Sequence, residues 1–203
     1  MKIKAIEAIC KAHKHITLYN TERGQWIGVG SAAYPLRNIP RLTEDHLFAI
    51  FDIPEDKQSR FYIESKSELP SEYDFSDATK YENLLEPYPI EISAYGGIIV
   101  PIVTSLGVVF IKKKYLKPFE DSERGVDLYE RVNDAGRLYI AVKDGFMLCG
   151  IILPIDIINE EFAGQLKKLY ELTNVSLQNQ AAAKLASGQM DITEALGSVK
   201  NEE

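Results

Sequence analysis

The plainest structural pattern in this chain lies in residues 137–154, Arg137-Leu138-Tyr139-Ile140-Ala141-Val142-Lys143-Asp144-Gly145-Phe146-Met147-Leu148-Cys149-Gly150-Ile151-Ile152-Leu153-Pro154. Two apolar runs flank Asp144-Gly145, a dipeptide typical of tight hairpin turns. Asn159 then precedes Glu160-Glu161, which is typical of a helix start. The spacing predicts a hairpin followed by a helix with a buried stripe, formed by Phe162, Leu166, Leu169 and Thr173.

The same order of elements is predicted near the other end of the chain. Residues 15–19 alternate like a strand, residues 20–24 have turn chemistry, and residues 25–29 form the return strand. A connection punctuated by prolines follows, and Thr43 caps a helix that ends before Pro54. Segments 15–53 and 137–172 therefore share an order of elements, and chance recurrence of so common a unit remains an alternative.

The remaining segments favour an α+β fold with a mainly antiparallel sheet, hairpin-helix units near both ends and a helical C-terminal appendage. Residues 3–12 read as an amphipathic helix, residues 98–111 are rich in β-formers, and residues 126–132 add an edge strand. Residues 64–91 hold eight carboxylates against two lysines, with four aromatic residues, and a short helix is expected at 77–85.

We expect one α+β domain over residues 1–175. Two pseudo-equivalent halves, about 1–63 and 92–175, joined by the acidic, tyrosine-rich segment 64–91, are the open alternative. Residues 176–203 are predicted to form a partly flexible helical tail, with a second capping pattern at Asp191-Ile192-Thr193-Glu194.

Charge and hydropathy exclude several classes of protein. A formal net charge of −7 argues against general nucleic-acid binding, which requires a basic face, and Lys112-Lys113-Lys114 reads as the solvated end of a strand. The apolar run 98–111 is too short and too interrupted to cross a membrane, and the N-terminus lacks the pattern of a signal peptide. We therefore expect a cytoplasmic protein without a membrane partner.

The three histidines of the chain are the best candidates for a metal site. His13 and His15 are two residues apart, so on a strand they would share a face, and His46 with a neighbouring aspartate would complete a divalent-metal set. The alternative is that His13 belongs to a solvated helix end. Cys10 and Cys149 lie in apolar runs without a nucleophile signature, and we interpret them as buried thiols.

The run Gly28-Val29-Gly30-Ser31-Ala32-Ala33 matches the letters of a dinucleotide-binding loop. That mechanism needs a helix directly after the glycines, and Tyr34-Pro35 makes one unfavourable, so the glycines are read as permitting a bulge or bend. No phosphate-binding loop or serine-nucleophile motif occurs in the sequence, and no bound cofactor is expected.

Trp26, Tyr34 and Arg37 gather at the exit of the first hairpin. Aromatic residues and arginine are enriched at interaction hot spots, although a lone tryptophan in a hairpin is usually a core anchor. The leading hypothesis is a non-enzymatic interaction or accessory protein that binds a protein partner or a second copy of itself.

Two alternatives stay open. The first is an enzyme with a divalent metal on His13, His15 and His46. The second is a clamp-like or nucleic-acid-mimicking protein, since repeated hairpin-helix units in an acidic chain look similar to the modules of DNA sliding clamps. The helix at 43–53, however, has no lysine or arginine to face DNA.

Overall fold

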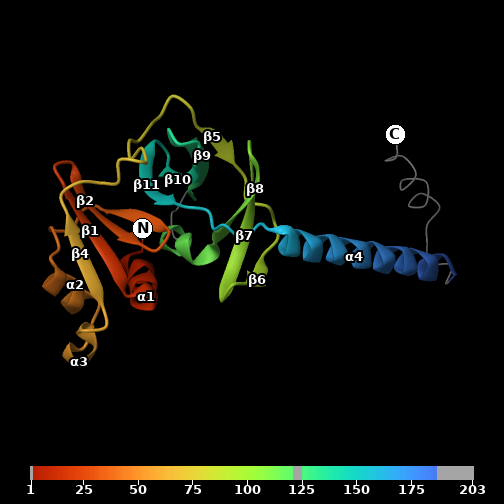
Figure 1. Cartoon of the computed structure of the whole chain (residues 1–203), viewed down its shortest axis with the longest axis horizontal. Coiled ribbons are helices and arrows are strands. Elements are labelled where there is room, and N and C mark those ends of the chain that lie inside the picture. The colour runs from red at the N-terminus through yellow and green to blue at the C-terminus, as the bar shows by residue number, and fades with distance from the viewer. Residues whose placement is uncertain (1, 121–124, 187–203) are drawn as a thin grey trace. The chain divides into compact units, whose positions relative to one another are not determined.

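The structure, a computed structural model, describes residues 2–120 and 125–186 (Figure 1). The chain divides into two compact units between Asp156 and Ile157. The first unit contains an eight-stranded sheet of order β4-β1-β2-β3-β11-β10-β9-β5 and a three-stranded sheet of order β6-β7-β8. All strand pairs are antiparallel except β1 with β4, and this confirms the predicted α+β class. The capping pattern predicted after residue 190 lies outside the described residues.

The N-terminal half of the large sheet follows a helix and forms a three-stranded meander. Its elements are α1 (Ile3–His13), β1 (His15–Thr21), β2 (Gly24–Val29) and β3 (Ala32–Leu36). The helix and the first hairpin were predicted, whereas Tyr34-Pro35-Leu36 was wrongly assigned to a connection. Pro35 is tolerated in β3 because β11 pairs with β3 only at Ala32 and Ala33, so the proline faces no strand on that side.

The second half mirrors this order. Its strands are β9 (Asp127–Val132), β10 (Leu138–Asp144) and β11 (Met147–Ile152). The turn between β10 and β11 is Gly145-Phe146, one residue later than the predicted Asp144-Gly145, because Asp144 still pairs with Met147. The edge is formed by β5 (Asn83–Leu85), which pairs with β9. The helix expected at 77–85 is therefore wrong, because Asn83-Leu84-Leu85 completes the ladder of β9. At the opposite edge, β4 (Tyr62–Lys66) runs parallel to β1.

Short helices and the small sheet complete the first unit. The helices are α2 (Glu44–Ile50) and α3 (Glu55–Gln58), with the 3₁₀ turns η1 (Lys113–Tyr115) and η2 (Lys117–Phe119). The small sheet contains β6 (Ile92–Ala94), β7 (Gly97–Thr104) and β8 (Gly107–Lys112). Thr43 caps α2 as predicted, since its hydroxyl oxygen accepts from the backbone N–H of His46 at 3.3 Å.

The second unit contains α4 (Glu160–Ala186), whose first turn is capped by Asn159 as predicted: its Oδ1 accepts from the N–H of Phe162 at 2.8 Å. Of the predicted buried stripe, Phe162 is buried, but the prediction is wrong for Leu166, Leu169 and Thr173, which are exposed. Within this unit, the described residues provide no second helix or strand to cover them. Among the helices that the structure describes, none has the length and apolarity needed to span a membrane.

The two faces of the large sheet are packed differently. Side chains of β1 and β2 alternate, so Ile16, Leu18, Ile27 and Val29 lie in the main core, with α1 as one of the helices that cover it. The opposite face carries a smaller cluster around Trp26, Tyr139, Ala141, Leu148 and Ile151. That cluster is covered by the covering segment, defined here as residues 67–82, and the part of the face beyond it forms a cleft.

Candidate ligand-binding cleft

The floor of the cleft is a row of residues that crosses four strands. Thr17 of β1 pairs with Gly28 of β2, Gly28 pairs with Ala33 of β3, and Ala33 pairs with Ile151 of β11. Paired residues point to the same side of a sheet, so all four share the second face. The two central positions carry a hydrogen and a methyl group. The Tyr19 ring takes up the room over Gly28, and the cavity beside it has a volume of about 300 Å³.

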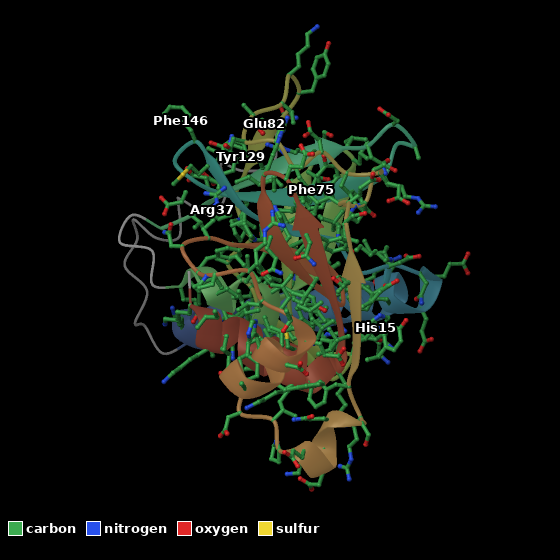
Figure 2. All side chains as sticks on the ribbon, turned by 90° about the vertical axis from the view of Figure 1, so that its left-hand side faces the viewer. His15, Arg37, Phe75, Glu82, Tyr129 and Phe146 are labelled. Carbon is green, nitrogen blue, oxygen red and sulfur yellow. The ribbon has the colours of Figure 1, made fainter. Side chains whose placement is uncertain are left out.

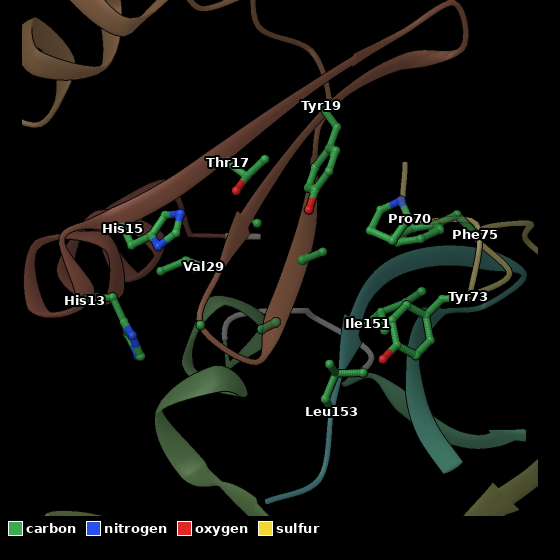
Figure 3. A pocket seen from close by; sticks show the side chains of 14 residues that line it. His13, His15, Thr17, Tyr19, Val29, Pro70, Tyr73, Phe75, Ile151 and Leu153 are labelled. Atoms are coloured by element: carbon green, nitrogen blue, oxygen red, sulfur yellow. The ribbon is translucent and has the colours of Figure 1, made fainter. Parts of the chain in front are cut away.

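Aromatic side chains form one wall of the cleft (Figure 3). Tyr73 and Phe75 come from the covering segment, together with Pro70, and Tyr19 comes from β1. A Cβ atom at Gly28 would lie 2.8 Å from Cε2 of Tyr19, so the Tyr19 ring lies directly over the glycine. Figure 3 shows the hydroxyls of Tyr19 and Tyr73 directed into the space between this wall and the histidines.

The opposite end of the cleft is formed by two histidines. Nε2 of His13 lies 2.8 Å from Nζ of Lys114 and 3.0 Å from the hydroxyl of Tyr115. Because a lysine ammonium only donates, Nε2 is the acceptor and the ring proton resides on Nδ1. Burial, then the charges of Lys114 and Lys112, lower the pKa of His13, which favours the neutral ring. The ring of His15 stands edge-on to Tyr62, with centroids 4.8 Å apart.

The turn between β2 and β3 holds this end in place. Gly30 has a φ of +58°, and a Cβ atom there would lie 2.5 Å from the hydroxyl oxygen of Tyr115. That hydroxyl accepts from the N–H of Ser31 at 3.2 Å, and the hydroxyl of Tyr34 donates to the carbonyl of Tyr115 at 2.9 Å. The run of small residues that resembles a nucleotide loop is therefore a hairpin turn, not a bulge, and no helix follows it.

Hydrogen-bond donors dominate the polar part of the lining. The hydroxyls of Thr17, Tyr19 and Tyr73 form no side-chain hydrogen bond with any described residue that the structure shows, and no Asp or Glu is among the described lining residues. The nearest carboxylate along the floor row is Glu64 of β4, which pairs with Thr17 in the ladder. It is bound by Lys66 at 3.1 Å.

A buried ionic cluster fixes the covering segment to the second half of the sheet. Arg131 is 1% exposed, and its guanidinium donates to the carboxylate of Glu82 at 2.7 and 3.0 Å. It also donates to the carbonyls of Asp74 and Ser76 at 3.0 and 2.9 Å. These two carbonyls flank Phe75, so the guanidinium positions the aromatic wall of the cleft.

Lys143 completes the cluster. Its ammonium donates to Glu82 at 2.6 Å and lies 4.7 Å from the ring centroid of Tyr129. Burial would raise the pKa of the Glu82 carboxyl, but hydrogen bonds from Lys143 and Arg131 outweigh it and lower the pKa. Figure 2 shows Glu82 and Tyr129 at the end of the sheet away from His15.

The residues predicted as an exposed recognition surface are placed differently from one another. Trp26 is 8% exposed and packs edge-on against Phe75, and Tyr34 is fully buried. Arg37 keeps a side chain that is 40% exposed and donates to the carbonyl of Leu148 at 2.8 Å. Trp26 therefore stands behind the aromatic wall, and Tyr34 supports the turn from the core side.

The three predicted metal ligands have separate partners. Nδ1 of His46 accepts from the N–H of Thr43 at 3.2 Å and closes the capping box of α2. His13 and His15 both line the cleft, but His13 directs Nε2 at a lysine, whose charge opposes a bound cation. No group of three or more His, Cys, Asp or Glu side chains suited to a metal ion occurs in the described residues. The metal site stays a prediction, without support from this geometry.

The chain was compared with protein families, curated proteins and solved structures, and no match was found in any of the three.

Proposed function

We propose that this chain is a non-enzymatic binding protein whose ligand occupies the cleft over Ala33, beside the Tyr19 ring that covers Gly28. The observation that carries the proposal is the floor row, in which glycine and alanine stand between Thr17 and Ile151 and leave room for the Tyr19 ring and a cavity of about 300 Å³ beside it. That volume lies at the lower end of the range typical of small-molecule sites, which is about 300–1,000 Å³.

The composition of the walls supports binding. Ligand sites combine mostly apolar surface with a few polar groups that fix orientation. Here Ile151, Leu153 and Phe75 supply apolar surface, and the hydroxyls of Thr17 and Tyr19 supply the polar groups. The buried cluster at Arg131 holds one wall in place without a ligand, which lowers the ordering cost of binding.

The proposal extends to an accessory role in the cytoplasm with a protein partner or a second copy. Large apolar side chains are exposed along α4, among them Leu169, Leu172 and Leu177, and Phe146 is 91% exposed at the tip of the β10–β11 hairpin (Figure 2). Exposed apolar residues that gather on one element favour association.

A fragment screen by methyl-detected NMR tests the cleft directly. Fragments that bind should shift the methyl resonances of Ile151 and Leu153, whereas those of the exposed Leu84, outside the cleft, should stay unchanged. Replacing Ala33 with leucine should fill the hollow and abolish these shifts while the fold is retained. A diverse library that shifts neither Ile151 nor Leu153 would refute the proposal.

A further inference from the structure

Resting on the proposed function, we infer that the ligand of the cleft is a compact organic acid. Its carboxylate lies toward the histidine end and the tyrosine hydroxyls, and its apolar or planar body lies against Ile151, Leu153 and Phe75. Hydroxyl donors line the cleft, and no carboxylate is among its described lining residues.

The polar lining matches an acceptor-rich anion. The hydroxyls of Thr17, Tyr19 and Tyr73 can each donate, and none is used in a side-chain hydrogen bond to a described residue that the structure shows. His13 lines the same end of the cleft, where Nζ of Lys114 lies 2.8 Å from its Nε2. Hydrogen bonds to a charged acceptor are about twice as strong as neutral ones, so such a set discriminates for an anion.

The surrounding charges also favour an anion. Lys114 lies behind His13 and is itself close to Lys112, and both charges act on the His13 ring. The carboxylate of Glu64 is held by Lys66, so this pair adds little net charge at the β4 side. The chain as a whole has a net charge of −7, but the surroundings of this site differ from that average: lysines lie behind His13, and no acid is among the described lining residues.

The apolar lining limits the size and shape of the body. In Figure 3 the side chains of Ile151 from β11 and of Leu153, which follows this strand, lie beside the ring of Tyr73. A planar ring can pack against such a mixed aliphatic and aromatic surface, and a volume of about 300 Å³ leaves room for a small acid and not for an extended one.

Benzoate and its neutral analogue benzamide are the probes that test this inference on the full chain. The single tryptophan of the sequence, Trp26, reports binding by fluorescence, because Phe75 of the cleft wall lies edge-on to it at 5.0 Å. Benzoate is expected to bind at least about tenfold more tightly than benzamide. Tyr19→Phe should weaken benzoate by about tenfold and benzamide by a smaller factor, because the hydrogen bond to a charged acceptor is the stronger one. Tyr81→Phe, at a residue 78% exposed and outside the cleft, is the matched control.

The outcomes distinguish a failure of the acid as ligand from a failure of the cleft as a binding site. Equal affinity for benzoate and benzamide, with cleft resonances shifted by both, would overturn the acid and leave the binding cleft intact. No response to either probe overturns the acid as well, and the fragment screen then decides whether the cleft binds at all. The tripeptide Gly-Gly-Phe, with a free or amidated C-terminus, distinguishes a peptide terminus from a free acid as the source of the carboxylate. Neither form of the tripeptide is expected to bind, because it is longer than the compact acid that the cleft has room for, and a preference for the free terminus would overturn the inference of a compact acid.

Discussion

Replacing Arg131 with methionine is the sharpest perturbation of this fold. The arginine is 1% exposed, and methionine keeps the length of its aliphatic part while removing every donor. Two hydrogen bonds to Glu82 disappear, and the carbonyls of Asp74, Ser76 and Asp77 lose a donor each.

The expected loss of stability follows from what remains. Removing one partner of a buried ion pair costs about 3–5 kcal/mol, because the other charge is left uncompensated. Glu82 keeps the ammonium of Lys143 at 2.6 Å, so the lower end, about 3 kcal/mol, applies. For a domain of this size that corresponds to a fall in Tm of about 6–12 °C.

Urea unfolding followed by circular dichroism measures the free energy, and tryptophan emission measures the local effect. Because Phe75 is flanked by two carbonyls that the guanidinium holds, Trp26 should become more exposed and its emission should shift to longer wavelength. Hydrogen exchange within residues 67–82 should accelerate more than exchange in β1 and β2.

The matched control is Arg60→Met, at an exposed arginine, which should change the free energy of unfolding by less than about 0.5 kcal/mol. If Arg131→Met also costs less than about 1 kcal/mol and leaves the emission of Trp26 unchanged, the cluster does not hold the covering segment. Such a result would show that Arg131 does not position Phe75 in the wall of the cleft.

Three further predictions concern single side chains. Burial, then the charge of a nearby glutamate, raises the pKa of the Cys10 thiol to about 12, so a thiol reagent at pH 8 should modify the half-buried Cys149 first and Cys10 only in denaturant; early loss of the Cys10 thiol by mass spectrometry would contradict this. Gly30→Ala should cost more than about 2 kcal/mol in urea, because φ is +58° and its Cβ would lie 2.5 Å from a tyrosine oxygen, whereas Gly136→Ala, with φ +75° in open space, should cost only about 1 kcal/mol. Burial and nearby lysines lower the pKa of His13 in the folded state, so the unfolded chain binds the proton at a higher pH than the folded chain. The contribution of His13 to the free energy of unfolding is therefore complete above about pH 6.5 and falls below it. His13→Gln should flatten that fall in urea titrations at about pH 5–7.

Local sequence signals were sufficient for the hairpins and helix starts. Thr43 and Asn159 formed the predicted caps, and the second hairpin turns within one residue of Asp144-Gly145, because each feature depends on residues within a few positions. The strand at Pro35 was missed for the same reason. A proline is penalised by any local rule, and only the short pairing of β3 with β11 shows why it is permitted.

The buried cluster could not be derived from local patterns. Glu82 is 49 residues from Arg131 and 61 from Lys143, and in sequence it reads as one more acid in an acidic segment. One signal was present: Lys143 follows the apolar run of β10, where an unpaired charge is costly. That position would have indicated a buried acid as partner, although not which one.

The small residues that form the floor of the cleft are visible in the sequence, but their role was not predicted from it. The small residues at 28–33 were weighed as a phosphate loop and then as a bulge, because both readings follow the chain. Their role depends on the pairing of neighbouring strands, because the register places Gly28 and Ala33 side by side in one row. Small side chains on neighbouring strands leave a hollow in a sheet face only when the strand register places them next to each other. In a hairpin that register is set by the turn between the strands.

The cleft and the buried cluster are coupled by the topology of the sheet. The two meanders meet at the pairing of β3 with β11, which the register limits to Ala32–Ala33 and Ile151–Ile152, and the floor row of the cleft crosses this seam. The covering segment also crosses from one half to the other, since it follows β4 at one edge and leads to β5 at the opposite edge. Because Arg131 fixes it through the carbonyls that flank Phe75, the wall on one side of the seam is held by the half on the other. A ligand that contacts both floor and wall therefore joins the two halves, and its binding energy adds to their stability.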